Sequence, residues 1–236
     1  MFDLIAFDAD DTLWHNETLY QAAQEKFRNL LSSYAPPDAI DRALYATELA
    51  NLSYFGYGIK SFILSMIETS FELSGGRIQS SEVVQIVRFA KEMIDGDVQL
   101  FEHVAAAVSQ LAGSHTLMLI TKGDPLDQER KFERSGLASS FKFIEILSDK
   151  TSSRYADILA RHQVSPDRFL MVGNSLRSDI FPVLEIGGCA VYIPYHLTWA
   201  HEKDTGDDQR DGFYEIEHIG LLPELVDKLE HQPESQ

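Results

Sequence analysis

The chain lacks most of the features that stabilise a protein covalently or direct it to a membrane. Its 236 residues include one cysteine, Cys189, so no internal disulfide can form and stability must come from a buried core. No apolar run approaches the length of about eighteen residues that a membrane-spanning helix needs. The first apolar segment, residues 2–7, is too short and too acidic for the hydrophobic part of a secretory signal. We therefore expect a cytoplasmic protein with no membrane partner.

Positive charge is also scarce. The chain has 20 Lys and Arg residues against 37 Asp and Glu residues, which gives a formal net charge of −17 at pH 7. A surface of this sign repels nucleic acid and anionic lipid, so neither is expected as a partner. If the substrate carries phosphate, local cations must overcome this field, and the search for a site therefore starts from lysines and from metal-binding side chains.

Short apolar runs separated by helical patterns dominate the rest of the sequence. Hydrophobic residues make up 44% of the chain, enough for a substantial core. Apolar runs of this length, bounded by turn or helix signals, are typical of buried parallel strands. They cover residues 4–7, 116–120, 141–147, 169–172 and 190–193. Helical patterns cover residues 126–135, 153–162, 178–186 and 221–229. The alternation predicts an α/β fold, with a Rossmann-like parallel sheet and helices on both of its faces.

The segment between the first two strands has a different pattern. Helical periodicity recurs at residues 17–34, 38–52, 59–73 and 82–94, with breaks at Pro36-Pro37 and at glycines. An all-helical block of this size, inserted between two strands, predicts a helical cap domain at residues 15–95. The core domain then comprises residues 1–14 and 96–236. Within the cap, residues 54–60 combine aromatics, glycines and a lysine, which suits either a loop that closes over substrate or a turn between helices.

Polar side chains follow four of the predicted strands. Ligands of open α/β sheets bind beyond the carboxyl ends of the strands, so these side chains are expected to form one site. They are Asp8 and Asp10 after the first strand, Thr121 and Lys122 after the second, Lys150 after the third, and Asn174 and Asp179 after the fourth. Each has an ordinary structural explanation when taken alone, such as a helix N-cap or a solvated lysine. Their shared position at four strand ends favours a functional site.

Three carboxylates at one sheet edge need cations nearby. Two like charges 4 Å apart repel by about 4 kcal/mol at the effective dielectric of a protein surface. Oxygen ligands suit Mg²⁺, which typically takes one or two carboxylates together with waters and substrate phosphate, and Lys150 would offset further charge. In such a site one carboxylate can attack phosphorus. A second carboxylate, two residues later, can give and take the proton.

The same residues carry a resemblance to a known family. Four motifs occur in the order that the haloacid dehalogenase (HAD) superfamily shows, namely Asp8-Ala9-Asp10-Asp11-Thr12, Thr121, Lys150, and Gly173-Asn174-Ser175 with Asp179. The chain resembles a phosphatase-type member with an early-inserted helical cap, and the likeness covers residues 1–14 and about 96–236.

The resemblance implies a role for each matching position. Asp8 would be the nucleophile and a Mg²⁺ ligand, and Asp10 the acid/base, with its backbone carbonyl also on the metal. Thr121 and the amides after it, beginning with Lys122, would hold the phosphoryl oxygens. Lys150 would orient Asp8 and neutralise charge, and Asp179 would help to hold the metal.

One position departs from the family pattern. The family usually has Asp where this chain has Asn174, a direct metal ligand. An amide oxygen can coordinate Mg²⁺ but brings no charge. Asn174 is kept as a metal ligand, while metal affinity and turnover stay open at this position.

These observations predict a Mg²⁺-dependent phosphatase that hydrolyses a small phosphorylated metabolite through an aspartyl-phosphate on Asp8, as a monomer or homodimer. Asp10 favours phosphoryl over halide chemistry, because the dehalogenase branch normally lacks an acid at that position. A receiver domain would place its phosphoacceptor after strand three, where this chain has Ser148-Asp149-Lys150, and has no place for the helical insertion. A phosphomutase with the same motifs stays open, as does a non-catalytic relative that binds a ligand or partner.

Overall fold

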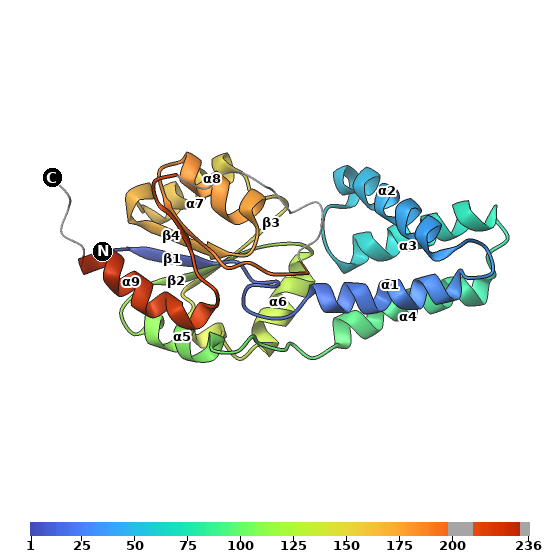
Figure 1. Ribbon diagram of the computed structural model, residues 1–236, viewed down its shortest axis with the longest axis horizontal. Coiled ribbons are helices and arrows are strands. Elements are labelled where there is room, and N and C mark those ends of the chain that lie inside the picture. The colour runs from blue at the N-terminus through green and yellow to red at the C-terminus, as the bar shows by residue number, and fades with distance from the viewer. Residues whose placement is uncertain (198–209, 232–236) are drawn as a thin grey trace. The chain divides into compact units, whose positions relative to one another are not determined.

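The computed structural model describes residues 1–197 and 210–231 (Figure 1). The chain divides into two compact units. Unit 1 comprises Met1–Glu17, Val98–Thr121 and Lys131–Gln236, and unit 2 comprises Thr18–Asp97 and Lys122–Arg130. None of the helices in the described ranges is long and apolar enough to cross a membrane.

Unit 1 is built around a parallel sheet of six strands in the order β3-β2-β1-β4-β5-β6. The strands are β1 (Leu4–Phe7), β2 (Leu117–Lys122), β3 (Phe143–Leu147), β4 (Phe169–Gly173), β5 (Cys189–Tyr192) and β6 (Phe213–Glu215). The first strand is central, since Ile5 pairs with Leu117 of β2 on one side and with Leu170 of β4 on the other. The α/β class and the parallel sheet predicted from the sequence are therefore confirmed.

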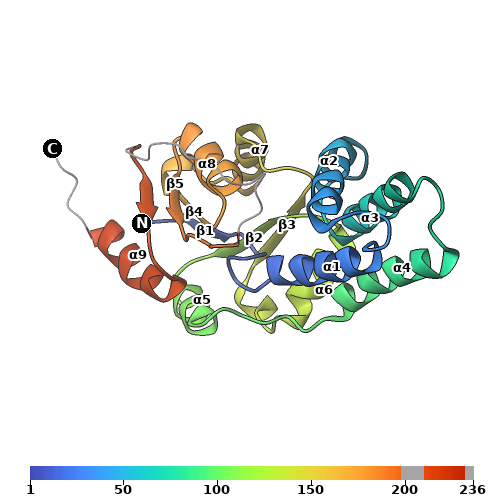
Figure 2. The same cartoon turned by 45° about the vertical axis from the view of Figure 1, so that its right-hand side comes forward.

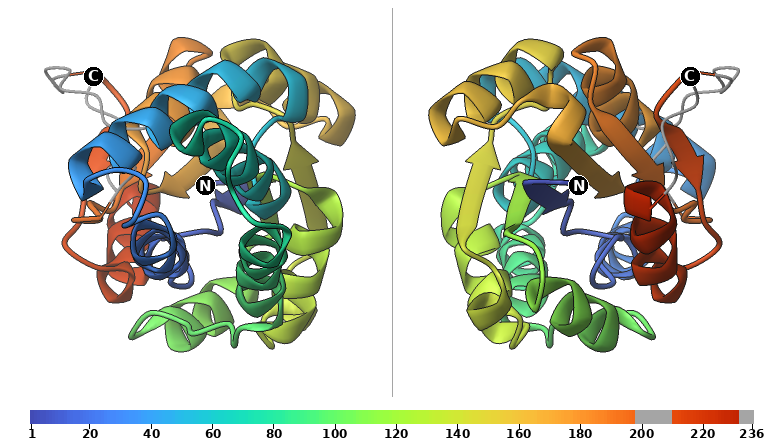
Figure 3. Two further views of the ribbon diagram at one scale, coloured as in Figure 1. Left: turned by 90° about the vertical axis from the view of Figure 1, so that its right-hand side faces the viewer. Right: turned by 90° about the vertical axis from the view of Figure 1, so that its left-hand side faces the viewer.

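Helices cover both faces of the sheet. Side chains of successive strand residues point to opposite faces, and each face has its own apolar layer. Ile5 and Phe7 pack in the layer that includes α5 (Val104–Ala112) and α9 (Leu222–His231). Leu4 and Ala6 pack in the layer that includes α7 (Ser152–His162) and α8 (Phe181–Glu185). Figures 1 and 3 show these two helix pairs on opposite sides of the strands.

Several elements differ from the sequence-based expectation. The second strand was expected at residues 116–120 but runs to Lys122, because backbone pairing continues after the apolar run has ended. The helix expected at residues 178–186 is two elements, a π-helical turn η3 (Leu176–Ile180) followed by α8. Pro182 lies in the first turn of α8, where its missing N–H is tolerated, whereas it would break one continuous helix. The helix α5 and the strand β6 were not predicted.

Unit 2 consists mainly of helices in the four segments where helical patterns occur. They are α1 (Glu17–Leu30), α2 (Pro37–Phe55), α3 (Ile59–Ser74) and α4 (Ser80–Asp95). Their inward faces form a separate core that includes Phe27, Leu44, Met66 and Ile86. Figures 1 and 2 show α2 and α3 side by side. Burial of these apolar faces, rather than helix propensity alone, stabilises helices of this length.

The contact between α2 and α3 is partly polar. Asn51 of α2 donates hydrogen bonds to Ser65 Oγ at 3.1 Å and to Glu68 Oε2 at 2.9 Å, and Thr69 Oγ1 donates to Thr47 Oγ1 at 3.1 Å. Glu48 lies in the same stretch of α2, and burial raises its pKa from 4.5 to about 7.

Replacing Glu48 with Gln should change the pH dependence of stability. Between about pH 4.5 and 7 the folded chain retains a proton on Glu48 that the unfolded chain releases, so the free energy of unfolding falls as pH rises through this window. Glu48→Gln should therefore raise the free energy of unfolding at pH 8 by roughly 1–2 kcal/mol and have little effect at pH 4. Urea unfolding at both pH values measures this. The exposed Glu72→Gln is the control, and an equal effect at both pH values would contradict the prediction.

Candidate active site

The polar residues identified from the sequence lie along one edge of the sheet. The strands β3, β2, β1 and β4 are neighbours in this order, and parallel strands end at the same edge. Asp8 directly follows β1, and Asn174 directly follows β4. Lys150 lies three residues beyond the end of β3, and Thr121 is the penultimate residue of β2.

A tight turn positions the first motif. The backbone N–H of Asp8 donates to Val172 O at 2.9 Å, which extends the pairing of β1 with β4 by one residue. The chain then reverses, with Leu13 N–H donating to Ala9 O at 2.8 Å. Asp11 takes a left-handed conformation with a φ of 61°, which Asp tolerates better than most residues. The turn thus fixes where Asp8 and Asp10 leave the backbone.

Asp11 caps the helix that follows the turn. Its carboxylate accepts the backbone N–H groups of Asn16, at 2.9 Å, and Glu17, at 3.0 Å, at the start of α1. Burial raises the pKa of Asp11 to about 7, and these two backbone hydrogen bonds oppose that rise. Its role is therefore to anchor the turn, which sequence reasoning did not assign.

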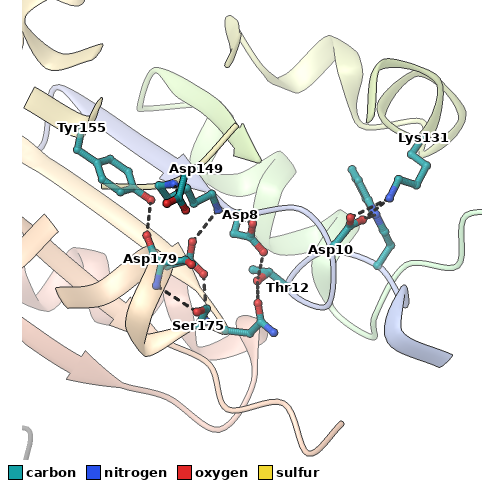
Figure 4. Close-up of polar contacts among 12 residues, drawn as sticks. Asp8, Asp10, Thr12, Lys131, Asp149, Tyr155, Ser175 and Asp179 are labelled. Carbon is teal, nitrogen blue, oxygen red and sulfur yellow. Dashed lines mark hydrogen bonds and ion pairs between the residues drawn. The ribbon is translucent and has the colours of Figure 1, made fainter. Parts of the chain in front are cut away.

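Lys150 brings two of the predicted site residues together. Its ammonium donates to Asp8 Oδ1 at 2.5 Å and to Asp179 Oδ1 at 2.6 Å. The side chains of Lys150 and Asp179 are each 1% exposed. Figure 4 shows Asp8 and Asp179, the two residues whose carboxylates share this ammonium. Asp8, which follows β1, and Asp179, in the turn η3 after β4, are 171 positions apart in sequence and share one cation.

The ionisation of this cluster depends on the shared cation. Burial raises the pKa of Asp179 above its ordinary value, and the charge of Lys150 only partly opposes that rise. For Lys150, burial alone would lower the pKa, but the charges of Asp179 and Asp8 raise it above its ordinary value. Lys150 is therefore protonated, and two carboxylates compete for one positive charge. Two carboxyl groups around one ammonium leave oxygens that can accept a further cation.

The backbone around Asp179 is shaped to receive its carboxylate. Ser175 N–H donates to Asp179 Oδ2 at 3.0 Å, and Asp179 N–H donates to Ser175 O at 2.8 Å. A Cβ added at Gly173 would lie 2.3 Å from Asp179 Oδ2, so only glycine leaves the carboxylate its place. Tyr155, fully buried in α7, donates to Ser178 O at 3.1 Å and supports the same turn (Figure 4). The π-helical turn η3 and the end of β4 therefore fit each other closely.

Asn174 joins the site through Thr12. The Thr12 hydroxyl lies 2.9 Å from Asp8 Oδ2 and 3.1 Å from Asn174 Oδ1. One hydroxyl proton serves one acceptor at a time, so Thr12 bridges the two residues without satisfying both fully. Asn174 is 8% exposed, at the same sheet edge as Asp8.

Asp10 points to a different partner. Lys131 Nζ donates to Asp10 Oδ1 at 2.7 Å and to Oδ2 at 2.8 Å, and Trp14 Nε1 donates to Oδ1 at 2.7 Å. Figure 4 shows the Asp10 carboxylate directed toward Lys131. Two aspartates separated by one residue therefore have separate lysine partners.

The two residues expected to hold phosphate lie in different units. Thr121 is 1% exposed and belongs to unit 1. Lys122 belongs to unit 2, where its ammonium lies 4.2 Å from the centroid of the Tyr57 ring. Lys60 pairs with Asp124 at 2.8 Å in the same unit. Residues 57–60, at the turn between α2 and α3 and the start of α3, thus contact residues 122–124 at the end of β2.

The structure brings Asp8, Lys150 and Asp179 into direct contact and links Asn174 to them through Thr12, while Asp10 turns to Lys131. Sequence reasoning did not identify Lys131, Trp14 or Tyr155. Lys131 lies within a predicted helix at a position that no spacing rule singles out, and Tyr155 was part of an apolar helix face. Trp14, four residues after Asp10, had no signal of its own.

The donor set of unit 1 fits a hard cation. Asp8 and Asp179 supply carboxylate oxygens, Asn174 supplies an amide oxygen, and the Asp10 carbonyl lies in the same turn as Asp8. In the described part of the chain no group of three or more His, Cys, Asp or Glu side chains forms a ready metal cluster. A Mg²⁺ site here therefore needs neutral oxygens, water and substrate phosphate in addition to two carboxylates, a mixture that Mg²⁺ commonly accepts.

Comparison with known proteins gives a consistent family match. The model of the haloacid dehalogenase-like hydrolases matches residues 2–182. A haloacid dehalogenase-like family hydrolase from Xanthomonas campestris is 38% identical, with 97% of this chain and 91% of that chain covered and a TM-score of 0.87. No curated protein matches the chain.

Two further solved structures share the fold at lower identity. A 2-haloacid dehalogenase from Pseudomonas syringae pv. Tomato is 22% identical, covers 97% of this chain and 100% of its own, and has a TM-score of 0.67. A HAD hydrolase from Bacillus subtilis, bound to magnesium, is 18% identical, covers 96% and 99%, and has a TM-score of 0.66. These two likenesses concern the fold alone.

Adding one methyl group at Gly173 should displace Asp179. Because the new Cβ would lie 2.3 Å from Asp179 Oδ2, Gly173→Ala forces the buried carboxylate away from Lys150 and should lower the free energy of unfolding by about 1–3 kcal/mol. Thermal and urea unfolding measure the change. Gly113→Ala is the matched control, because Gly113 has an ordinary helical φ of −71°. Equal stability of the two variants would contradict the fit described above.

Proposed function

Because the chain belongs to the haloacid dehalogenase-like hydrolase family, we propose that it is a phosphatase that hydrolyses a small phosphate monoester with Mg²⁺. The observation that supports this most is the placement of Asp8. One of its oxygens accepts from Lys150 and the other from Thr12, at the sheet edge where ligands of such folds bind. These two contacts orient the Asp8 carboxylate and place a positive charge beside it, as suits a nucleophile.

In the first step, a carboxylate oxygen of Asp8 attacks phosphorus as the bond from phosphorus to the leaving oxygen breaks. Asp10, in its protonated form, gives its proton to the leaving alkoxide, and the alcohol departs. The product is an aspartyl-phosphate on Asp8. Lys150 stabilises the negative charge on the transferring group, since placement of charge dominates the catalysis of phosphoryl transfer.

In the second step, Asp10 acts as a base. It takes a proton from water while the water oxygen attacks phosphorus, and the bond between phosphorus and Asp8 breaks. Inorganic phosphate leaves, Asp8 is again a carboxylate, and Asp10 is again protonated. Thr121, buried at the end of β2, and the backbone amides after it are proposed to hold the phosphoryl oxygens.

Magnesium would be held by Asp8, Asp179, Asn174 and the Asp10 carbonyl, and would supply positive charge to the phosphoryl oxygens. Asn174 brings an oxygen without charge, so this site carries one negative charge fewer than an all-aspartate set. The carboxyl groups of Asp8 and Asp179, which meet at Lys150, support a cation here even so.

The position of Asp10 argues for phosphate over halide chemistry. A halide leaves without a proton, whereas an alkoxide needs one, and Asp10 lies two residues beyond the nucleophile to supply it. A phosphomutase would use the same residues on a phosphosugar, and a non-catalytic relative would bind phosphate without turnover. A screen of sugar phosphates, nucleotides, carboxylic-acid phosphates and 2-haloacids, with Mg²⁺ or chelator, separates phosphatase activity from dehalogenase activity. Chelator-sensitive phosphate release supports the phosphatase, and halide release would overturn it.

Replacing Asp8 with Asn should abolish turnover, because the amide cannot form the aspartyl-phosphate. The protein should remain folded, with phosphate release from the best substrate of the screen reduced to background. Asp3→Asn, on the exposed surface where Asp3 pairs with Arg168, is the control and should retain activity. Activity of the folded Asp8→Asn protein would refute the nucleophile assignment.

Replacing Asn174 with Asp should strengthen Mg²⁺ binding. A third carboxylate, beside those of Asp8 and Asp179, adds a charged ligand, so the Kd for Mg²⁺ should fall by about 3- to 30-fold. Without metal the same change should lower Tm, because the single hydroxyl proton of Thr12 cannot be donated to two carboxylates at once. Isothermal titration calorimetry and melting with and without Mg²⁺ measure both effects. Asn29→Asp, on an exposed part of α1, controls for net charge, and an unchanged Kd would remove Asn174 from the ligand set.

A further inference from the structure

The Asp10 carboxylate accepts hydrogen bonds from two side chains that belong to none of the four sequence motifs. Lys131 contacts both of its oxygens, at 2.7 and 2.8 Å, and the Trp14 indole N–H donates to Oδ1 at 2.7 Å. The Lys131 ammonium also lies 3.2 Å from Asn16 Oδ1. These donors come from two segments of unit 1, the turn after β1 and the last turn of α6 (Pro125–Arg134).

The surroundings make this contact stronger than a surface ion pair. The Lys131 side chain is 12% exposed, the Asp10 side chain is 21% exposed, and Trp14 is fully buried. Exposed ion pairs contribute little because water and salt screen them. A charge-assisted pair that is largely shielded from water, with both carboxylate oxygens engaged, is shorter and more directional. Both donors to Asp10 are also held in place, because Lys131 lies on a helix and Trp14 lies in a packed turn.

We propose that Lys131 is a positioning residue which, with Trp14, sets the direction of the Asp10 carboxylate. The proposal rests on the proposed function, in which Asp10 transfers the proton. Proton transfer requires the donor and acceptor oxygens to be within hydrogen-bond distance and aligned. An aspartate side chain turns about two single bonds, and contacts to both oxygens restrict that turning. Lys131 therefore acts through Asp10, without contacting the reacting atoms.

A purely structural role for Lys131 predicts a different result. If the ion pair only ties the last turn of α6 to the turn after β1, its loss lowers stability and reduces activity equally for every substrate. If Lys131 positions the general acid, the loss depends on how much the leaving group needs a proton. An aryl phosphate has a stable leaving anion and needs little protonation, whereas an alkyl phosphate needs it fully.

The kinetic experiment compares kcat/KM for an alkyl phosphate and for 4-nitrophenyl phosphate. The ratio kcat/KM covers binding and departure of the leaving group and excludes the later hydrolysis of the aspartyl-phosphate. Lys131→Met should lower kcat/KM by about 10- to 100-fold for the alkyl ester and by less than about 3-fold for the aryl ester. Lys131→Arg should restore most of the alkyl activity, since its donors reach both oxygens. Trp14→Phe, which removes only the N–H donor, should give a smaller loss with the same selectivity.

A double-mutant cycle and a crystal structure complete the test. In an Asp10→Asn background, Lys131→Met should add almost no further loss, because the group through which it acts is already absent. The crystal structure of Lys131→Met should show the Asp10 carboxylate turned from its present direction. Lys228→Met, which removes an exposed pair with Glu224 on α9, is the control and should change none of these readouts.

Equal losses for both esters, additive losses in the double mutant, or an unchanged Asp10 orientation would each overturn the proposal. If the unmodified protein cleaves neither ester, the proposed phosphatase function fails. The crystal structure of Lys131→Met then decides alone, through the orientation of Asp10, whether Lys131 holds this side chain.

Discussion

The site depends on one buried ammonium shared by two carboxylates. Lys150 lies between Asp8 and Asp179 at 2.5 and 2.6 Å, almost wholly out of water. Without this cation the two carboxylates would repel each other in a medium where the charge of each is poorly solvated. Neighbouring features serve the same contact, because Gly173 leaves room for the Asp179 carboxylate and the Ser175 N–H hydrogen bonds to it. The end of β4 is thus shaped around the charge that Lys150 balances.

The two aspartates of the first motif contact different partners, which suits them to different roles. Asp8 contacts Lys150 and Thr12, whereas Asp10 contacts Lys131 and Trp14. Chemically identical groups two residues apart can take different roles when their surroundings differ. The tight turn of residues 8–14 achieves this by sending the two side chains in different directions (Figure 4).

The sequence predicted those parts of the molecule that depend on periodicity and on strand ends. Apolar runs located five strands, and the parallel order then brought Asp8, Lys150 and Asp179 together as expected. It missed β6, a three-residue strand with partly exposed side chains, and the continuation of β2 through Thr121, because backbone pairing can outlast the apolar pattern. Lys131 was missed because its importance comes from a contact across 121 residues, and helix periodicity specifies which face a residue occupies, without specifying its partner on another element.

The helical setting of Lys131 places a limit on how the chain can vary in length. Each residue of an α-helix turns by about 100°, because 3.6 residues complete a turn. Inserting or deleting a single residue in α6 before Lys131 would rotate its side chain by roughly that angle and carry it off the face that meets Asp10. The number of residues between the end of β2 and Lys131 is therefore constrained, even though this stretch contains no motif.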